Sequence, residues 1–288
     1  MSPLALSKLH ATGNDFLVTL ALDPDSPPLD AVEVAALCDR HRGVGADGLI
    51  TVTPGRGGSD CTMTLVNADG GLAEMSGNGI RCLAWVAARA GLARGDTLVV
   101  DTAAGRRVVA LERAGGEVVA AEVDMGPVTF DPARIPVEAD SPFGLEAVVE
   151  DVAYLGDAAG MGNPHLVVFV DDPADVPVAR HGPRLERDRR FPRRANVEFV
   201  AVAAPDRVTM RVWERGVGET LSCGTGACAA AAVAHRRGLV PERVRVDVPG
   251  GTLTVTLGPS VRLGGPVVHV FDVDIPRERL RRSLARPA

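Results

Sequence analysis

The chain has 288 residues, of which 46% are hydrophobic and 24% charged, and its formal net charge is −6. This length allows one large core or two smaller ones, whereas the acidic balance and the 3% aromatic content argue against nucleic-acid binding. The N-terminus lacks signal-peptide features and no apolar run approaches the roughly 20 residues that cross a bilayer, so we expect a cytoplasmic protein with no membrane partner.

Five cysteines are scattered along the chain. Their odd number and the lack of a C-x-x-C pair argue against a disulfide framework and a structural zinc site. The sequence also has no P-loop and no dinucleotide-binding glycine motif, so we expect chemistry without a metal or cofactor. Four of the cysteines are interpreted as small core residues: Cys38, Cys61, Cys82 and Cys228.

An internal duplication organises the sequence. Residues 75–92 and 222–239 share glycines at corresponding positions, and residues 98–105 similarly match 244–251. A third echo, in the same order, relates GNDFLV at 13–18 to GNPHLV at 162–167. Each half is therefore predicted to be one structural unit.

Each repeat contains a glycine-rich turn and then an alanine-rich helix, apolar nearly all round, that ends at Gly91 or Gly238. Ala104-Gly105 and Gly250-Gly251 mark hairpin turns. The predicted fold class is α+β, with two pseudo-symmetric domains that are each a mostly antiparallel β-barrel or roll around a central buried helix. β-branched segments predict strands at 97–102, 107–111, 117–123, 197–203, 208–213, 244–248 and 252–257.

The repeats set the expected domain boundaries. Residues 1–123 form the predicted N-terminal half and 124–268 the C-terminal half, and the segment from about 269 to 288 is expected to return to the first half. The segment 180–194 is predicted to be a basic, solvated loop. We expect the active site in the cleft between the halves.

Ser76 and Cys223 stand at the starts of the two predicted helices. Amides at a helix N-terminus are unpaired and partly positive, so they can hold a carboxylate. A cysteine there has a lowered thiol pKa, which predicts that Cys223 acts as a thiolate base. One acid or base group on each face of a carbon atom permits racemisation or epimerisation. The amides concerned belong to Gly77, Asn78, Gly224 and Thr225.

Glu214 and Arg215 lie shortly before Cys223. Arg215 can bind a carboxylate through two parallel hydrogen bonds, and Glu214 can bind an ammonium group. This pair predicts a zwitterionic ligand.

Eight motifs spread over nearly the whole chain resemble those of one family. They are HATGNDF at 10–16, GVGADG at 43–48, NADG at 67–70, GNGIRC at 77–82, MGNPH at 161–165, NVEF at 196–199, WERG at 213–216 and CGTGAC at 223–228. With them the sequence resembles the diaminopimelate epimerases, within the larger proline-racemase-like fold.

The resemblance implies conversion of LL-2,6-diaminopimelate to meso-diaminopimelate, for lysine and peptidoglycan precursor synthesis, without pyridoxal phosphate. It also places His165 near the catalytic pair, and it makes a second copy of the chain a partner, because the family often forms homodimers. The residues implied to bind the amino and carboxylate groups of the substrate are Asn14, Asn67, Asn163, Asn196, Glu214 and Arg215, with Gly77-Asn78 and Gly224-Thr225 around the reacting carboxylate.

Two positions depart from the family pattern. Gly48 stands where the family commonly has Gln, and Ser76 stands where it has its first catalytic cysteine. A serine hydroxyl is a far weaker acid than a thiol, whose reference pKa is about 8.5. Ser76 has three possible interpretations. It is an inactivating substitution, it belongs to a natural variant with a slower or altered proton relay, or it marks a protein that has diverged in function.

The sequence is also compatible with two other classes of function. A one-base lyase or isomerase of an amino or imino acid needs only Cys223, and a catalytically silent amino-acid-binding protein needs neither group. Solvent-deuterium exchange separates these three classes.

Overall fold

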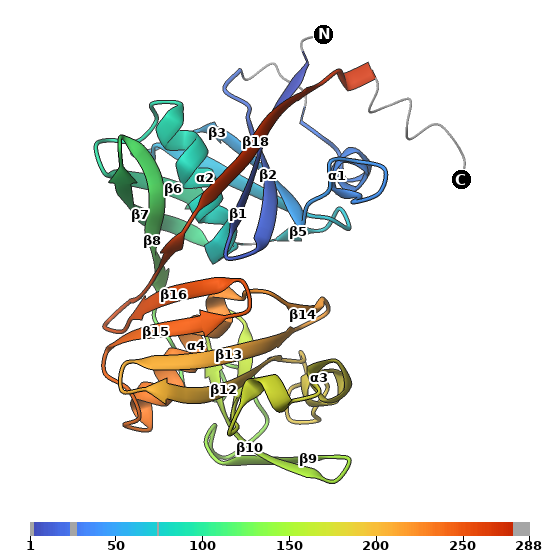
Figure 1. The fold of residues 1–288 in the computed structure, drawn as a ribbon, viewed down its shortest axis with the longest axis vertical. Coiled ribbons are helices and arrows are strands. Elements are labelled where there is room, and N and C mark those ends of the chain that lie inside the picture. The colour runs from blue at the N-terminus through green and yellow to red at the C-terminus, as the bar shows by residue number, and fades with distance from the viewer. Residues whose placement is uncertain (1–2, 24–27, 74, 279–288) are drawn as a thin grey trace. The chain divides into compact units, whose positions relative to one another are not determined.

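The structure, a computed structural model, describes residues 3–23, 28–73 and 75–278. These residues form two compact units (Figure 1). Unit 1 contains the described residues of 3–123 and 265–278, and unit 2 contains residues 124–264. None of the helices in the described part of the chain is long and apolar enough to cross a membrane.

Unit 1 is built from antiparallel and parallel strand pairs and two helices. Its elements are β1 (Leu4–Ala11), β2 (Asn14–Leu20), α1 (Ala31–Cys38), β3 (Gly48–Pro54), β4 (Cys61–Asn67), β5 (Leu72–Ala73), α2 (Gly77–Arg89), β6 (Thr97–Thr102), β7 (Gly105–Ala114), β8 (Glu117–Gly126) and, from the C-terminal segment, β18 (Val268–Ile275). Strand β18 lies antiparallel beside β1 (Figure 1), so the chain returns to its first half.

Unit 2 repeats this sequence of elements. It contains β9 (Leu145–Val149), β10 (Val152–Gly160), β11 (Pro164–Phe169), the short helix η1 (Pro173–Asp175), α3 (Val178–Glu186), β12 (Asn196–Ala204), β13 (Arg207–Glu214), β14 (Gly218–Thr220), α4 (Gly224–Arg236), β15 (Arg243–Val248), β16 (Gly251–Thr256) and β17 (Val261–Pro266).

The strand pairings of the two units match in order and direction. In unit 1, the antiparallel hairpin β1–β2 is followed by the parallel pair β2–β3 and the antiparallel pair β3–β4. In unit 2, the antiparallel hairpin β10–β11 is followed by the parallel pair β11–β12 and the antiparallel pair β12–β13. Next come the parallel pair β4–β6 and the antiparallel hairpin β6–β7 in unit 1, and the parallel pair β13–β15 and the antiparallel hairpin β15–β16 in unit 2. This repetition confirms the duplication at the level of topology.

The central helices α2 and α4 are buried along most of their length. Most of their buried residues are apolar, and those of α4 are mostly alanine and glycine, as expected for a helix covered on every side. The predicted strands from Thr97 onward and the hairpin turns before Gly105 and Gly251 are confirmed. The predicted fold class, strands around a buried helix in each half, is also confirmed.

The predicted basic loop at 180–194 is wrong in its first part. Helix α3 extends through Glu186 although it contains Pro183. Packing explains the helix, because Gly182 lies directly against Trp213, where an added Cβ would be 2.6 Å from the Trp213 Cβ atom. Tertiary contacts therefore outweigh the local penalty of proline.

Candidate active site

Helices α2 and α4 begin in the same way. Ser76 is the N-cap of α2 and Cys223 is the N-cap of α4, and both have extended backbone conformations, with φ −134° and −121°. The Oγ atom of Ser76 accepts a hydrogen bond of 3.0 Å from the Gly79 amide. The next residues, Gly77-Asn78 and Gly224-Thr225, form the first turns, so their amides lie at helix N-termini as predicted.

The thiol of Cys223 is buried, with only 4% of the residue exposed. Burial raises the pKa of Cys223 well above its usual value, and the negative charges of Glu214 and Glu198 raise it further. Contacts from the Thr225 hydroxyl and the Gly226 amide lower this pKa only in part. The sequence-based prediction of a lowered thiol pKa was therefore wrong, because desolvation and two carboxyl groups outweigh the helix N-terminus.

Glu214 lies at the end of β13 and is held close to the thiol. Its Oε1 atom accepts a hydrogen bond of 2.5 Å from the Thr220 hydroxyl. Burial raises the pKa of Glu214, although hydrogen bonds from Thr220 and Cys223 lower it in part. A partly buried acid therefore lies beside the thiol in unit 2.

A chain of polar contacts leads from Cys223 into the core of unit 2. The Sγ atom lies 3.6 Å from the Thr225 hydroxyl, which accepts from the Asn163 Nδ2 atom at 3.5 Å. The Asn163 Oδ1 atom lies 2.8 Å from His165 Nε2, and His165 Nδ1 lies 2.7 Å from Glu198 Oε1. His165 and Glu198 are fully buried. The structure thus brings Asn163, His165 and Thr225 together with Cys223.

Asn196 and Arg215 are placed differently. The buried Asn196 side chain donates to the Pro164 carbonyl at 3.1 Å and accepts from the Arg215 amide at 2.9 Å, so it fixes two loops. The Arg215 side chain is exposed and donates to the Arg193 carbonyl at 3.1 Å. Asn196 is therefore a residue that positions the Glu214-Arg215 turn, and Arg215 is accessible to a ligand.

Glu186 of α3 also holds this turn. Its carboxylate accepts from Trp213 Nε1 at 2.9 Å and from the Gly216 amide at 3.1 Å. Sequence analysis missed Glu186 because it lies far from the motif in sequence and belongs to the segment that was predicted to be a loop.

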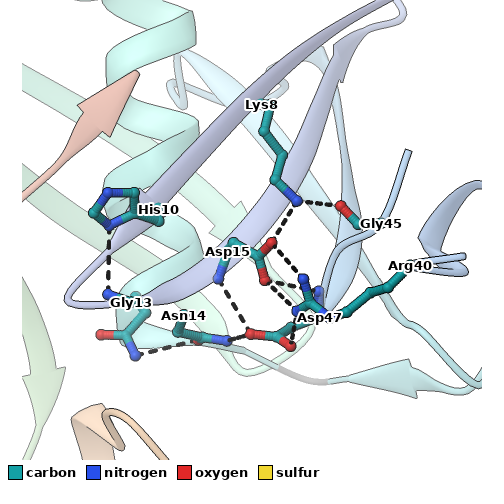
Figure 2. A network of polar contacts seen from close by, with 9 residues as sticks. Lys8, His10, Gly13, Asn14, Asp15, Arg40, Gly45 and Asp47 are labelled. Atoms are coloured by element: carbon teal, nitrogen blue, oxygen red, sulfur yellow. Dashed lines mark hydrogen bonds and ion pairs between the residues drawn. The ribbon is translucent and has the colours of Figure 1, made fainter. Parts of the chain in front are cut away.

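In unit 1, Asn14 and Asn78 form one hydrogen-bonded group. Asn78 Nδ2 donates to Asn14 Oδ1 at 3.2 Å. Asn14 Nδ2 donates to Asp47 Oδ2 at 2.6 Å (Figure 2). The fully buried Arg81 donates to Asn78 Oδ1 at 2.8 Å. Both asparagines are thus held in fixed orientations near Ser76, by Asp47 and Arg81, to which sequence analysis gave no role.

An ion-pair cluster lies next to the hydrogen-bonded group of Asn14 and Asn78. Asp15 accepts two hydrogen bonds from Arg40, at 3.0 and 2.7 Å, and contacts Lys8, which also contacts the Gly45 carbonyl (Figure 2). Burial alone raises the pKa of Asp15, but hydrogen bonds from Arg40 and Lys8 outweigh burial and hold that pKa at about 2. Arg40 also binds Asp47 at 2.8 Å and so connects the cluster to Asn14.

Asn67 and Gly48 lie opposite each other on β4 and β3. Asn67 is exposed, so its amide is accessible. A Cβ at Gly48 would lie 2.8 Å from the Val66 carbonyl oxygen, closer than the backbone tolerates. Gly48 can therefore contact a ligand only through its backbone.

The four cysteines predicted to be core residues are buried. Burial raises the pKa of Cys38 to about 11 and the pKa values of Cys61 and Cys82 to about 12. These thiols are protonated at neutral pH.

Solved structures place the fold within a known class. The structure is similar to that of a hydroxyproline epimerase from Agrobacterium vitis with bound trans-4-OH-L-proline, with a TM-score of 0.68, 17% sequence identity, and coverage of 96% of this chain and 94% of the other. The fold is therefore that of the proline-racemase and diaminopimelate-epimerase class.

Sequence comparisons narrow this class to one family. The family model for diaminopimelate epimerase matches residues 6–130 and 158–266. A diaminopimelate epimerase from Microcystis aeruginosa is 41% identical over 278 residues, 93% of this chain and 98% of the relative. One from Pelotomaculum thermopropionicum is 40% identical over 275 residues, 94% of this chain and 98% of the relative. The chain belongs to the diaminopimelate epimerase family and is an isomerase.

Proposed function

We propose that this protein converts LL-2,6-diaminopimelate to meso-diaminopimelate without a cofactor, and so serves lysine and peptidoglycan precursor synthesis. The observation that supports this most strongly is the pair of equivalent helix starts, at which Ser76 and Cys223 are both N-caps. Epimerisation needs two proton carriers for one α-carbon, and the duplication supplies one in each unit.

In the proposed reaction the α-carboxylate binds to the helix amides of Gly77-Asn78 and Gly224-Thr225, which are suited to anions. The thiolate of Cys223 removes the α-proton, and the carbanion receives a proton on its other face from the Ser76 hydroxyl, directly or through water. The Oγ atom of Ser76 accepts from the Gly79 amide, which leaves its O–H free to donate.

The remaining polar groups are proposed to bind the substrate's charged ends. Asn14, Asn67 and Asn163 offer amides, and the exposed guanidinium of Arg215 suits a carboxylate. Glu214 suits an ammonium group, whose charge would favour ionisation of this partly buried acid.

The test is incubation with LL-diaminopimelate in D₂O, followed by chiral separation and mass spectrometry. We expect meso product that carries one α-deuterium. Cys223→Ala should lower the rate by at least about 10², the usual worth of a positioned acid or base, whereas Cys61→Ala, a buried cysteine of unit 1, should not.

Other outcomes identify the competing classes. Loss of a group from the substrate, with Cys223 still required, would indicate a one-base lyase or isomerase. Binding of diaminopimelate with neither deuterium uptake nor product would indicate an amino-acid-binding protein, and both results contradict the proposal.

A further inference from the structure

The two units hold the asparagines next to their helix starts in different ways. Three pairs of positions correspond by the duplication: Asn14 and Asn163, Asn78 and Thr225, and Arg81 and Cys228. In unit 2, the Nδ2 atom of Asn163 donates to the Thr225 hydroxyl at 3.5 Å. In unit 1, the Oδ1 atom of Asn14 accepts from Asn78 Nδ2 at 3.2 Å. The two corresponding asparagines thus turn opposite edges of their amides towards the first helical turn.

Arg81 supplies the chemical difference in unit 1. Its side chain is fully buried and donates to Asn78 Oδ1 at 2.8 Å. It also donates to the Gly77 carbonyl at 3.3 Å and to the Thr12 hydroxyl at 3.5 Å. A guanidinium carries five donors and no acceptor. The Asn78 side chain must therefore turn its oxygen atom towards Arg81, and its Nδ2 atom donates to Asn14.

The other end of this hydrogen-bonded group has the opposite chemistry. Asn14 Nδ2 donates to Asp47 Oδ2 at 2.6 Å (Figure 2), and a carboxylate has only acceptors. The Asn14 oxygen atom must therefore face Asn78. A donor-only group at one end and an acceptor-only group at the other give both asparagine amides a single orientation.

The Arg81 guanidinium also contacts the turn that carries Asn14. Thr12 lies between β1 and β2 with φ 49°, in the left-handed region that a β-branched residue rarely adopts. Its hydroxyl accepts from Arg81, and the residue is buried. Met161, the counterpart of Thr12 in unit 2, does not adopt this conformation. The strained turn and the buried arginine therefore occur together in one unit and are both replaced in the other.

We propose that Arg81 is a positioning residue for substrate binding, which fixes the amide orientation of Asn78 and, through Asn78 and Thr12, that of Asn14. The inference rests on the proposed function, in which Asn14 and the Gly77-Asn78 turn bind the substrate. Because Arg81 is fully buried, it acts through these residues rather than by contact with the ligand. Its loss should weaken binding more than it slows the chemical step.

The kinetic test compares Arg81→Met, which removes every donor, with Arg81→Lys, which keeps a donor-only group. With LL-diaminopimelate, Arg81→Met should raise KM about tenfold or more and change kcat by less than about threefold, since a hydrogen bond from a charged donor is lost from binding. Arg81→Lys should stay within about threefold of the wild-type KM, because an ammonium group supplies only donors. Arg89→Met, the control, removes an exposed guanidinium from the same helix and should leave both constants unchanged.

Thr12→Gly tests the same role in a variant that folds readily. Glycine adopts a positive φ without strain, so the free energy of unfolding should not fall, but the hydroxyl that accepts from Arg81 is lost. We expect KM to rise at least about threefold, as for the loss of one neutral acceptor. An unchanged KM in Thr12→Gly would count against the proposal.

A further measurement needs no substrate and so separates this proposal from the epimerase assignment. In a nitrogen–proton NMR spectrum of the free protein, the side-chain amide signal of Asn14 is identified by its loss in Asn14→Ala. The signal should shift or broaden in Arg81→Met, although Asn78 lies between the two residues. It should keep its position in Arg89→Met.

An unchanged Asn14 signal in Arg81→Met would overturn the proposal. So would equal rises of KM in Arg81→Met and Arg81→Lys, or a fall of kcat alone, which is the result of a purely structural role. If the wild type does not convert diaminopimelate but the Asn14 signal responds as predicted, the proposed reaction fails and the role of Arg81 in orienting Asn14 is supported. Circular dichroism checks that each variant is folded.

Discussion

Individual side chains explain why the two helix starts are unequal. Ser76 caps α2 with an oxygen atom that accepts from the Gly79 amide, and serine is among the preferred N-cap residues. Cys223 occupies the same position but lies among carboxyl groups and is held protonated. In the proposed reaction, this pair supplies one strong and one weak proton carrier.

The cap contact gives a prediction for stability. Ser76→Cys replaces a good N-cap acceptor by a poor one, so it should lower the free energy of unfolding by about 0.5–1 kcal/mol. Urea denaturation measures this change. Unchanged or increased stability would mean that the Ser76 cap contributes nothing.

A second prediction concerns the orientation of Asn14. Asp47→Ala removes the acceptor that holds the Asn14 amide at 2.6 Å, and loss of one hydrogen bond of this kind is worth roughly 1.5 kcal/mol. We therefore expect the KM for diaminopimelate to rise about tenfold with a smaller change in kcat. Asp69→Ala, whose carboxylate accepts from the Gly71 amide on an exposed turn, is the control, and equal effects would contradict the role of Asp47.

At the scale of elements, the sequence predicted those helices and strands whose formation depends on a local pattern of residues. The strands after Thr97 and the two buried helices carry clear β-branched or alanine-rich patterns and were found where expected. Helix α3 was missed because Gly182 and Pro183 read locally as breakers, whereas Trp213 stabilises the helix from another strand. The buried Glu198 was visible in a motif, but only the folded structure shows that it packs against Gly226 in the first turn of α4.

The first turns of α2 and α4 provide matched substitutions. Gly226→Ala would force a Cβ to within 2.6 Å of Glu198 Oε1, in a fully buried layer, so overpacking should destabilise unit 2 by about 1–3 kcal/mol. Gly79→Ala meets the Ile50 methyl at 3.0 Å, where a small shift suffices and alanine favours the helix. Urea denaturation should show a much smaller loss for Gly79→Ala, and equal losses would contradict the packing difference.

At the scale of the molecule, the motifs and the repeat were sufficient to predict the family and the duplicated architecture. The electrostatic state of Cys223 was not predictable, because it depends on desolvation and on carboxyl groups from strands that are distant in sequence. The same holds for the Lys8–Asp15–Arg40 cluster, whose members come from β1, β2 and the segment after α1.

This cluster should set the acid stability of unit 1. The pKa of Asp15 is about 2 in the folded state, below its unfolded value near 3.9, so its contribution is present above about pH 4 and is lost as the pH falls towards 2. At 1.36 kcal/mol per pKa unit, Asp15→Asn should lower stability by about 2 kcal/mol at pH 7 and by little at pH 2. Urea denaturation of the wild type and of Asp15→Asn between pH 2 and pH 7 measures this loss of stability.

The control for this prediction is Asp206→Asn. Asp206 forms an ion pair with Arg245 at 3.1 Å, but both side chains are about half exposed, so its loss should change stability by less than about 1 kcal/mol. A difference between Asp15→Asn and wild type that is independent of pH would contradict the assigned role of the Asp15 charge.

In the proposed reaction, Ser76 and Cys223 are the two unequal proton carriers for one α-carbon. The most direct test is the rate of LL- to meso-diaminopimelate conversion by the wild type, Ser76→Cys, Cys223→Ser and the double variant that exchanges the two residues. We predict that Ser76→Cys is faster than wild type by roughly 10²–10⁴, that Cys223→Ser is slower by a similar factor, and that the exchanged pair lies between the wild type and Cys223→Ser. A Cys223→Ser variant as active as the wild type, or a Ser76→Cys variant with an unchanged rate, would contradict the account.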